Sequence, residues 1–99
     1  MPYAHAFVVP GTRGLYDALH AEFRRYPTAE MVLHLARPVP EGTEVVEVWT
    51  SAEALGSWTA AHAGPAMGAV AAAGWTVPDI APTPFDLAGL IIPAAGIDA

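Results

Sequence analysis

Val45-Val46-Glu47-Val48-Trp49-Thr50-Ser51-Ala52-Glu53-Ala54-Leu55 is the stretch that decides the fold, because it joins a strand directly to a helix. Its β-branched valines favour a pleated strand. Thr50 followed three residues later by Glu53 is typical of a capping box, in which each side chain satisfies a free backbone donor of the other residue. We therefore expect a strand that ends at Trp49 and a helix that begins immediately after it.

Working back from this stretch, the sequence predicts two more strands and one more helix. Alternation of side chains predicts strands over 3–9 and 30–37, and the proline-containing segment 38–42 favours a hairpin from the second of these into 43–49. Between the first two strands, Thr12 can cap a helix over 13–25. Its inward-facing stripe is predicted to be Leu15, Leu19, Phe23 and Tyr26.

Towards the carboxyl end, the helix after Trp49 is expected to break at Gly64-Pro65, with a short further helix over 66–73. An irregular arm over 75–84 should lead to an apolar strand over 85–92, and the last six residues are expected to be a loose tail. The order strand, helix, strand, strand, helix, strand predicts one α+β domain over 1–99. This is a ferredoxin-like split βαβ sandwich, with a four-stranded antiparallel sheet and both helices on one face.

Composition limits the classes of partner. Among 99 residues there are 4 basic and 10 acidic ones, giving a formal net charge of −6, which argues against nucleic acid or an anionic membrane as partner. The chain has no Cys, which excludes disulfides, thiolate metal sites and cysteine nucleophiles.

Hydrophobic residues make up 54% of the chain, more than a small monomer needs, so we expect a subunit interface, a ligand cavity or both. Without a signal peptide or a membrane-spanning run, we expect a cytoplasmic protein, and the lack of Lys, Asn and Gln fits a GC-rich bacterial genome.

Several motifs carry a family resemblance. The stretch from Val45 to Ala54, the aromatic Trp58, Pro65, and Gly11 with Tyr16-Asp17 are similar to the signature of the antibiotic biosynthesis monooxygenase-like family of dimeric α/β-barrel proteins. The resemblance implies a homodimer whose two sheets pair face to face into an α/β barrel. It also implies an apolar aromatic small molecule as ligand. The superfamily includes cofactor-free oxygenases of aromatic polyketides, cyclases, isomerases, haem-degrading enzymes and many proteins without an assigned function.

The sequence departs from that signature at three positions. Thr50 stands where the family commonly has an acidic residue, Leu55 where it has Phe, and Trp58 where it often has a smaller aromatic residue. These changes preserve the packing pattern and alter the shape of any cavity. A different ligand is therefore compatible with the resemblance.

A cofactor-free oxygenase needs aromatic walls and one base, and a histidine is suited to be that base because its ordinary pKa lies near neutrality. The candidate catalytic residues are His34, His5 and Trp49. Trp49 is predicted either to line a cavity or to fill a core, and a strand histidine is also compatible with a structural role. The candidate substrate-binding residues are Phe7, Tyr16, Glu47, Trp58, His62 and Met67. For Tyr16, as for His20, a place at the surface is expected more than a place in a site.

The sequence predicts no metal site and no cofactor. Its four histidines fall on different elements, and no glycine-rich phosphate loop or nucleotide fingerprint is present. Trp49 with His62 resembles the arrangement of haem-degrading relatives, in which the His ligates iron, but those relatives also use an Asn that this chain lacks. The leading hypothesis is a cofactor-independent monooxygenase of bacterial secondary metabolism that acts on an apolar aromatic or polyketide-like molecule. The alternatives are a non-redox cyclase or isomerase, and a non-catalytic binding protein.

Overall fold

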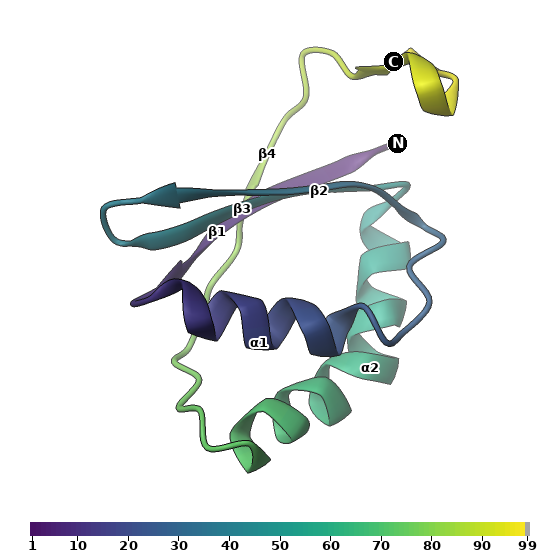
Figure 1. Cartoon of the computed structure of the whole chain (residues 1–99). Coiled ribbons are helices and arrows are strands. Elements are labelled where there is room, and N and C mark those ends of the chain that lie inside the picture. The colour runs from purple at the N-terminus through teal and green to yellow at the C-terminus, as the bar shows by residue number, and fades with distance from the viewer. Residues whose placement is uncertain (99) are drawn as a thin grey trace.

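The computed structural model describes residues 1–98 and has two helices on one face of a small sheet (Figure 1). A short hairpin follows at the carboxyl end, on the other side of the sheet (Figure 1). The elements in order are β1 (Tyr3–Pro10), α1 (Arg13–Phe23), β2 (Met31–Val39), β3 (Gly42–Trp49), α2 (Ala52–Ala72), β4 (Thr83–Phe85), β5 (Ile91–Ile92), the 3-10 turn η1 (Pro93–Ala95) and β6 (Ile97–Asp98).

The main sheet confirms the predicted α+β architecture. Its four strands lie in the order β2-β3-β1-β4, and every neighbouring pair is antiparallel. This arrangement, with both helices on one face, is compatible with a ferredoxin-like fold. The hairpin between β2 and β3 forms as predicted, and β3 occupies the centre of the sheet between β2 and β1. Side chains on β3 can therefore meet partners from two strands at once.

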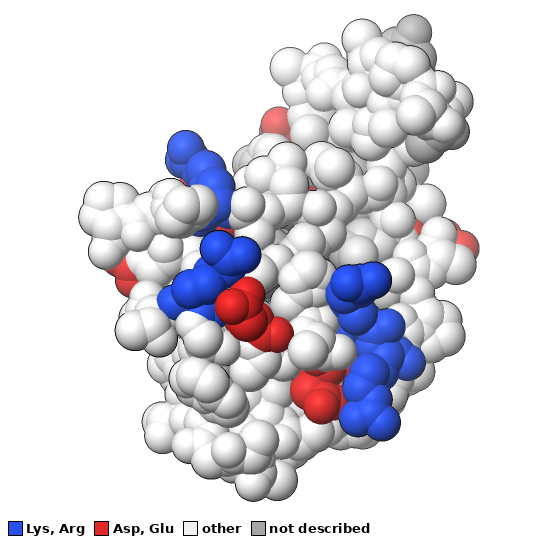
Figure 2. Space-filling view, viewed as in Figure 1, with Lys and Arg blue, Asp and Glu red and all other residues white. Residues whose placement is uncertain are grey.

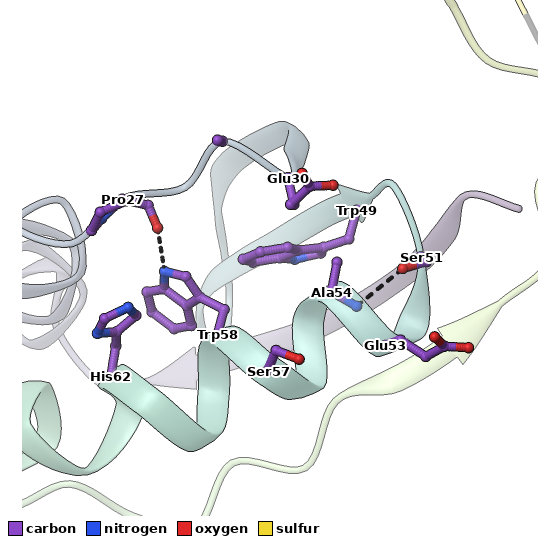
Figure 3. A pocket seen from close by; sticks show the side chains of 10 residues that line it. Pro27, Glu30, Trp49, Ser51, Glu53, Ala54, Ser57, Trp58 and His62 are labelled. Atoms are coloured by element: carbon purple, nitrogen blue, oxygen red, sulfur yellow. Dashed lines mark hydrogen bonds between the residues drawn. The ribbon is translucent and has the colours of Figure 1, made fainter.

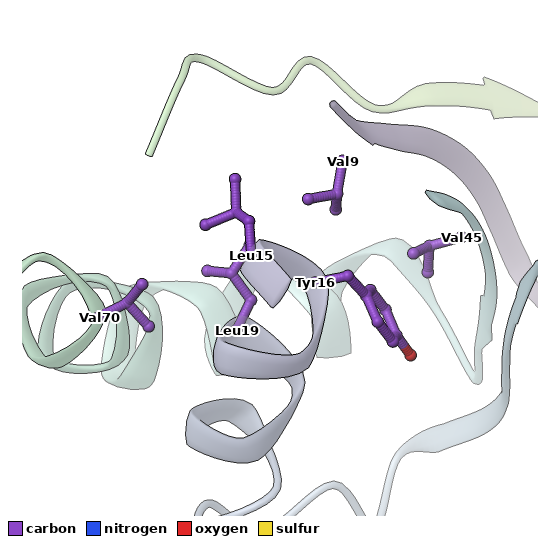
Figure 4. Close-up of a cluster of buried hydrophobic side chains, with 6 residues drawn as sticks. All are labelled: Val9, Leu15, Tyr16, Leu19, Val45 and Val70. Carbon is purple, nitrogen blue, oxygen red and sulfur yellow. The ribbon is translucent and has the colours of Figure 1, made fainter. Parts of the chain in front are cut away.

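The core lies between the sheet, α1 and the later part of α2, and Figure 4 shows its buried side chains. Leu15 and Leu19 of α1 are buried there, as the predicted stripe requires. Tyr16 is also buried, with 6% of its surface exposed, which corrects the expectation that it lies at the surface. Tyr26 lies beyond the end of α1, so the predicted stripe was too long at this end. The buried cluster consists of Val9, Leu15, Tyr16, Leu19, Val45 and Val70.

The helix after Trp49 begins with a different cap from the predicted one. Ser51 is the N-cap residue, and its hydroxyl accepts a hydrogen bond from the backbone N–H of Ala54 at 3.0 Å. The hydroxyl of Thr50 donates instead to the carboxylate of Glu30. The predicted capping box is therefore wrong: the cap is Ser51, and Ala54, three residues later, has no side chain that could bond back to it. Thr12 does occupy the N-cap position of α1, but its side chain makes no capping hydrogen bond.

The predicted break at Gly64-Pro65 is wrong. Pro65 lies inside α2, which continues to Ala72. Because proline has no N–H and crowds the preceding turn, it bends a helix without necessarily ending it. Figure 1 shows the resulting change of direction along α2. The alanines on either side have the highest helix propensity of any residue, which favours continuation of the helix.

The predicted strand over 85–92 is also wrong. Only Thr83–Phe85 pairs with β1, and Ile91–Ile92 pairs separately with β6. Asp86 and Gly89 interrupt the apolar run, and both residues are unfavourable in strands. The tail expected after Pro93 forms η1 and β6 as far as residue 98, and Ala99 lies outside the described residues.

Candidate functional site

Three polar side chains lie in a row across the middle of the sheet. The strand register places Glu47 of β3 directly opposite His5 of β1 on one side and His34 of β2 on the other. Directly opposed residues in antiparallel strands point to the same face, with Cβ atoms about 5 Å apart. Val45 of β3, two residues before Glu47, belongs to the core beneath the helices. The row therefore faces the helices, inside the domain.

Glu47 accepts a hydrogen bond from each of three donors. Nε2 of His5 lies 2.9 Å from Oε1 of Glu47, and Nδ1 of His34 lies 2.8 Å from Oε2. The indole N–H of Trp49 donates to Oε1 at 3.2 Å, so the predicted common face of Glu47 and Trp49 is confirmed. Only 15% of the Glu47 side chain is exposed. An ionised carboxylate can only accept hydrogen bonds, so Nε2 of His5 and Nδ1 of His34 must each carry the proton of its bond to Glu47.

The hydrogen bonds keep Glu47 ionised although it is mostly buried. Burial alone raises the pKa of a carboxyl, but hydrogen bonds from His34, His5 and Trp49 outweigh it and lower the pKa of Glu47 to about 2. The site therefore holds a permanent negative charge at neutral pH. No lysine or arginine pairs with that charge among the described salt bridges, and its partners are two histidines.

Helix α1 extends the row by two side chains. The hydroxyl of Tyr16 lies 2.8 Å from Nε2 of His34 and 3.0 Å from Nδ1 of His20. Tyr16 and His20 are four residues apart on the helix, the spacing that brings side chains together on one face. Burial raises the pKa of Tyr16, and it lowers the pKa of His20, with a further lowering from the charge of His34. We call the five residues His5, Glu47, His34, Tyr16 and His20 the polar chain.

A second feature is an open groove of about 570 Å³ beside the start of α2. Trp49 forms one wall, and Trp58 and His62 project from α2 on the other side (Figure 3). Two carboxylates, those of Glu30 and Glu53, also line the groove. The complete lining is Pro27, Ala29, Glu30, Trp49, Ser51, Glu53, Ala54, Ser57, Trp58 and His62.

Aromatic contacts hold the groove in shape. The indole N–H of Trp58 donates to the backbone carbonyl of Pro27 at 2.7 Å, as the dashed line in Figure 3 marks. The ring of Trp58 lies 5.8 Å from that of Trp49 and 5.6 Å from that of His62, measured between centroids. Tyr26 also stacks on His62, with the ring centroids 4.8 Å apart. Such contacts suit a wall for a flat apolar ligand.

Trp49 belongs to both features. It is 2% exposed, and its ring lines the groove while its N–H binds Glu47. The two alternatives stated for Trp49, core and cavity wall, are therefore both part of its environment. A change at Trp49 would affect the groove and the polar chain together.

The remaining predicted site residues lie apart from the groove. Phe7 and Met67 are partly buried and pack against the hydrophobic core, and neither lines the groove. Phe7 does line a second, smaller hollow of about 460 Å³ with residues of the arm before β4. His20 was assigned to the surface, but the structure joins it to His34 through Tyr16. The i,i+4 spacing of Tyr16 and His20 was the signal in the sequence, and it became informative only once β2 was known to lie beneath them.

Charged side chains elsewhere are sparse and locally paired. Arg13 pairs with Asp17 at 3.0 Å, and Arg37 pairs with Glu44 at 2.7 Å. On the face drawn in Figure 2, most of the surface is uncharged and acidic side chains lie beside basic ones. Within residues 1–98, no group of three or more His, Asp or Glu side chains has the arrangement that could hold a metal ion. Neither helix of this part of the chain has both the length and the apolar character needed to cross a membrane.

Comparisons with known proteins give no family for this chain. No protein-family model matches it, and searches of curated proteins and of solved structures found no match.

Proposed function

We propose that this protein is a cofactor-independent monooxygenase of bacterial secondary metabolism that acts on an apolar aromatic or polyketide-like molecule. One observation carries the proposal: histidines and a tyrosine are hydrogen-bonded in series to a carboxylate that is ionised at neutral pH. Such a series can accept a proton from a weakly acidic ligand and place the resulting positive charge beside Glu47. Proton removal is the step that makes an anthrone-like ring system electron-rich enough to react with oxygen.

An oxygenase of this kind also needs a surface on which flat rings can rest, and the groove supports the proposal in this respect. Trp49 and Trp58 present aromatic walls, and Trp49 connects this surface to the polar chain through Glu47. After proton removal, the substrate carbanion bonds to molecular oxygen and takes up a proton to give a hydroperoxide. Loss of water then leaves a carbonyl group. In total, a CH₂ group and one O₂ molecule become a C=O group and one water molecule, so no external reductant is needed.

The central prediction is oxygen consumption with an anthrone as probe substrate. We expect the protein to consume one O₂ for each ketone formed and to incorporate one atom of isotopically labelled oxygen into the product. General acid–base catalysis typically contributes about 100-fold or more to the rate, so His34→Ala, which removes the ring between Tyr16 and Glu47, should lower kcat by at least that factor. Trp49→Phe keeps a ring in the groove but removes the donor to Glu47, and it should lower kcat less than His34→Ala does.

Other outcomes identify the alternatives. Product formation without oxygen uptake would replace the oxygenase with a non-redox cyclase or isomerase that uses the same base. Binding of the anthrone without turnover would identify a non-catalytic binding protein. Turnover that survives both His34→Ala and Trp49→Phe, with only the affinity changed, would remove the polar chain from the chemistry.

We also propose that the chain forms a homodimer through the outer face of its sheet. Cross-strand register places Leu33 and Leu35 of β2 beside Val48 and Val46 of β3 on the face opposite the helices, where Val48 is already buried within the chain. Leu35 is 44% exposed, and Phe85 of β4 is 42% exposed on the same face. Sedimentation at micromolar concentration should give the mass of a dimer, and Leu35→Glu should shift it towards the monomer. A wild-type monomer at that concentration would contradict the proposal.

A further inference from the structure

The directions of the hydrogen bonds in the polar chain can be worked out from Glu47. Because Glu47 is an acceptor, Nδ1 of His34 carries a proton, and in neutral His34 the other nitrogen, Nε2, is an acceptor. The hydroxyl of Tyr16 therefore donates to His34. The oxygen of Tyr16 can then only accept from Nδ1 of His20. In neutral His20 this leaves Nε2 with a free lone pair.

Among the described side chains, the His20 end of the polar chain is the one that a ligand can reach. Both ring nitrogens of His34 are engaged, one with Glu47 and the other with Tyr16. His5 is 5% exposed, and its Nε2 is engaged with Glu47. His20 is partly exposed, and among the described side chains its Nε2 makes no hydrogen bond. A substrate can therefore reach a free basic nitrogen at His20 but not at Nδ1 or Nε2 of His34.

We infer that His20 is the catalytic base, and that Tyr16 relays its proton so that the positive charge comes to rest on His34 beside Glu47. The inference rests on the proposed function for the identity of the proton donor. Nε2 of His20 takes the substrate proton while Nδ1 releases its own to the oxygen of Tyr16. The hydroxyl of Tyr16 passes its original proton to Nε2 of His34. The two hydrogen bonds of the Tyr16 hydroxyl are remade in the opposite direction, while the one from His34 to Glu47 keeps its direction. The polar chain gains the one proton that the substrate loses.

The surroundings favour the charge on His34 over His20. The carboxylate of Glu47 lies 2.8 Å from Nδ1 of His34 and accepts no hydrogen bond from His20. Burial lowers the pKa of His20, as do the charges of His34, Arg24 and Arg13, while Asp17 acts in the opposite direction. The titratable and charged groups that face His20 are thus Arg13, Tyr16 and Asp17 of α1, Arg24 at the C-cap of α1, His34 of β2 and, through His34, Glu47 of β3.

His20 does not line the groove, but Phe23 of the same helix connects the two. Phe23 follows His20 by three residues on α1, so the two side chains are neighbours on the helix surface. The ring of Phe23 lies 5.2 Å from that of Trp58, which lines the groove. A substrate of several fused rings can therefore rest against Trp58 and direct its acidic C–H or O–H group towards His20. This favours polycyclic substrates over single rings.

The test uses NMR of the ring nitrogens in the full-length chain, which report both the charge and the tautomer of each histidine. As the pH is lowered, we expect His34 to become charged while His20 stays neutral and switches from the Nδ1–H to the Nε2–H tautomer in the same step. In Tyr16→Phe, which keeps the core ring, the tautomer of His20 should no longer follow the charge of His34. Tyr3→Phe removes a hydroxyl for which no hydrogen bond is described, and it should behave as the wild type.

The relay is overturned if, in the wild type, His20 keeps the Nδ1–H tautomer when His34 becomes charged, or if His20 becomes charged first. The wild-type spectra alone decide this, whether or not the Phe variant folds. Kinetics on the anthrone give a second readout: Tyr16→Phe and His20→Gln should lower kcat at least tenfold with little change in KM, and both should alter the pH profile. A relay seen by NMR without oxygen consumption would refute the proposed function alone, and oxygen consumption without the relay would refute this inference alone.

Discussion

Glu47→Gln should lower the free energy of unfolding at neutral pH by about 3 kcal/mol, the stabilisation that corresponds to holding a carboxyl pKa at about 2 in the folded chain. A carboxyl whose pKa is lowered by folding stabilises the fold when the pH is above its unfolded pKa. This stabilisation disappears as the pH falls through the folded pKa. The difference in stability between wild type and variant should therefore be full near pH 6 and shrink between about pH 4 and about pH 2. Urea unfolding at a series of pH values measures it.

Glu41→Gln is the matched control, because Glu41 is exposed in the turn between β2 and β3 and is not a member of the polar chain. Its stability should follow that of the wild type at every pH. A Glu47→Gln variant that is as stable as the wild type at neutral pH would show that the three donors do not stabilise the carboxylate. A difference that stays constant down to pH 2 would show that the pKa of Glu47 is not lowered by folding.

Gly42→Ala should destabilise the chain by about 3 kcal/mol, for a purely steric reason. Gly42 begins β3 with φ of +154°, and a Cβ atom there would overlap the backbone carbonyl oxygen of Val9 in β1. Backbone atoms cannot rotate out of the way as a flexible side chain can. The two strands would have to separate at the end where β1 pairs with β3. Thermal or urea unfolding measures the loss.

Gly56→Ala serves as the control because it makes the same chemical change inside α2. A Cβ atom there meets no atom within 4 Å, so the variant should be as stable as the wild type or more stable by about 1 kcal/mol, the gain in helix propensity. Equal stability of the two alanine variants would contradict the close approach of Gly42 to Val9.

The sequence predicted the layers of the fold because side-chain periodicity is local information. The alternation around His5 and His34 gave both strands, and the common face of Glu47 and Trp49 followed from the period of two. Three predictions were wrong: the capping residue of α2, the break at Pro65 and the length of the last strand. Each of them depends on backbone direction or on competition between neighbouring elements. Ser51 and Thr50 are equally good caps, and Pro65 proved compatible with a bent helix. The interruption of the last strand at Asp86 depended on which residues could pair with β1.

The candidate site was predicted as a set of residues but not as an arrangement. His5, His34, Glu47 and Tyr16 were all named, yet their contacts depend on strand register, which periodicity does not determine. The hairpin alone could have paired His34 with Glu47 if the positions of its two turn residues had been fixed. Pairing His5 with Glu47 required the alignment of β1 against β3, a contact between residues 42 positions apart. His20 was expected at the surface, because its connection to His34 through Tyr16 depends on the position of β2 beside α1.

The row of His5, Glu47 and His34 also constrains how the strands can align. A slip of β1 or β2 by one residue would turn its histidine to the opposite face of the sheet and leave Glu47 with fewer donors. A buried carboxylate without its partners is strongly destabilising, so misaligned sheets are penalised more heavily than apolar contacts alone would penalise them. These three residues therefore favour the correct register of β1, β3 and β2, and the hydrogen bonds of the candidate site form only when the sheet is correctly aligned.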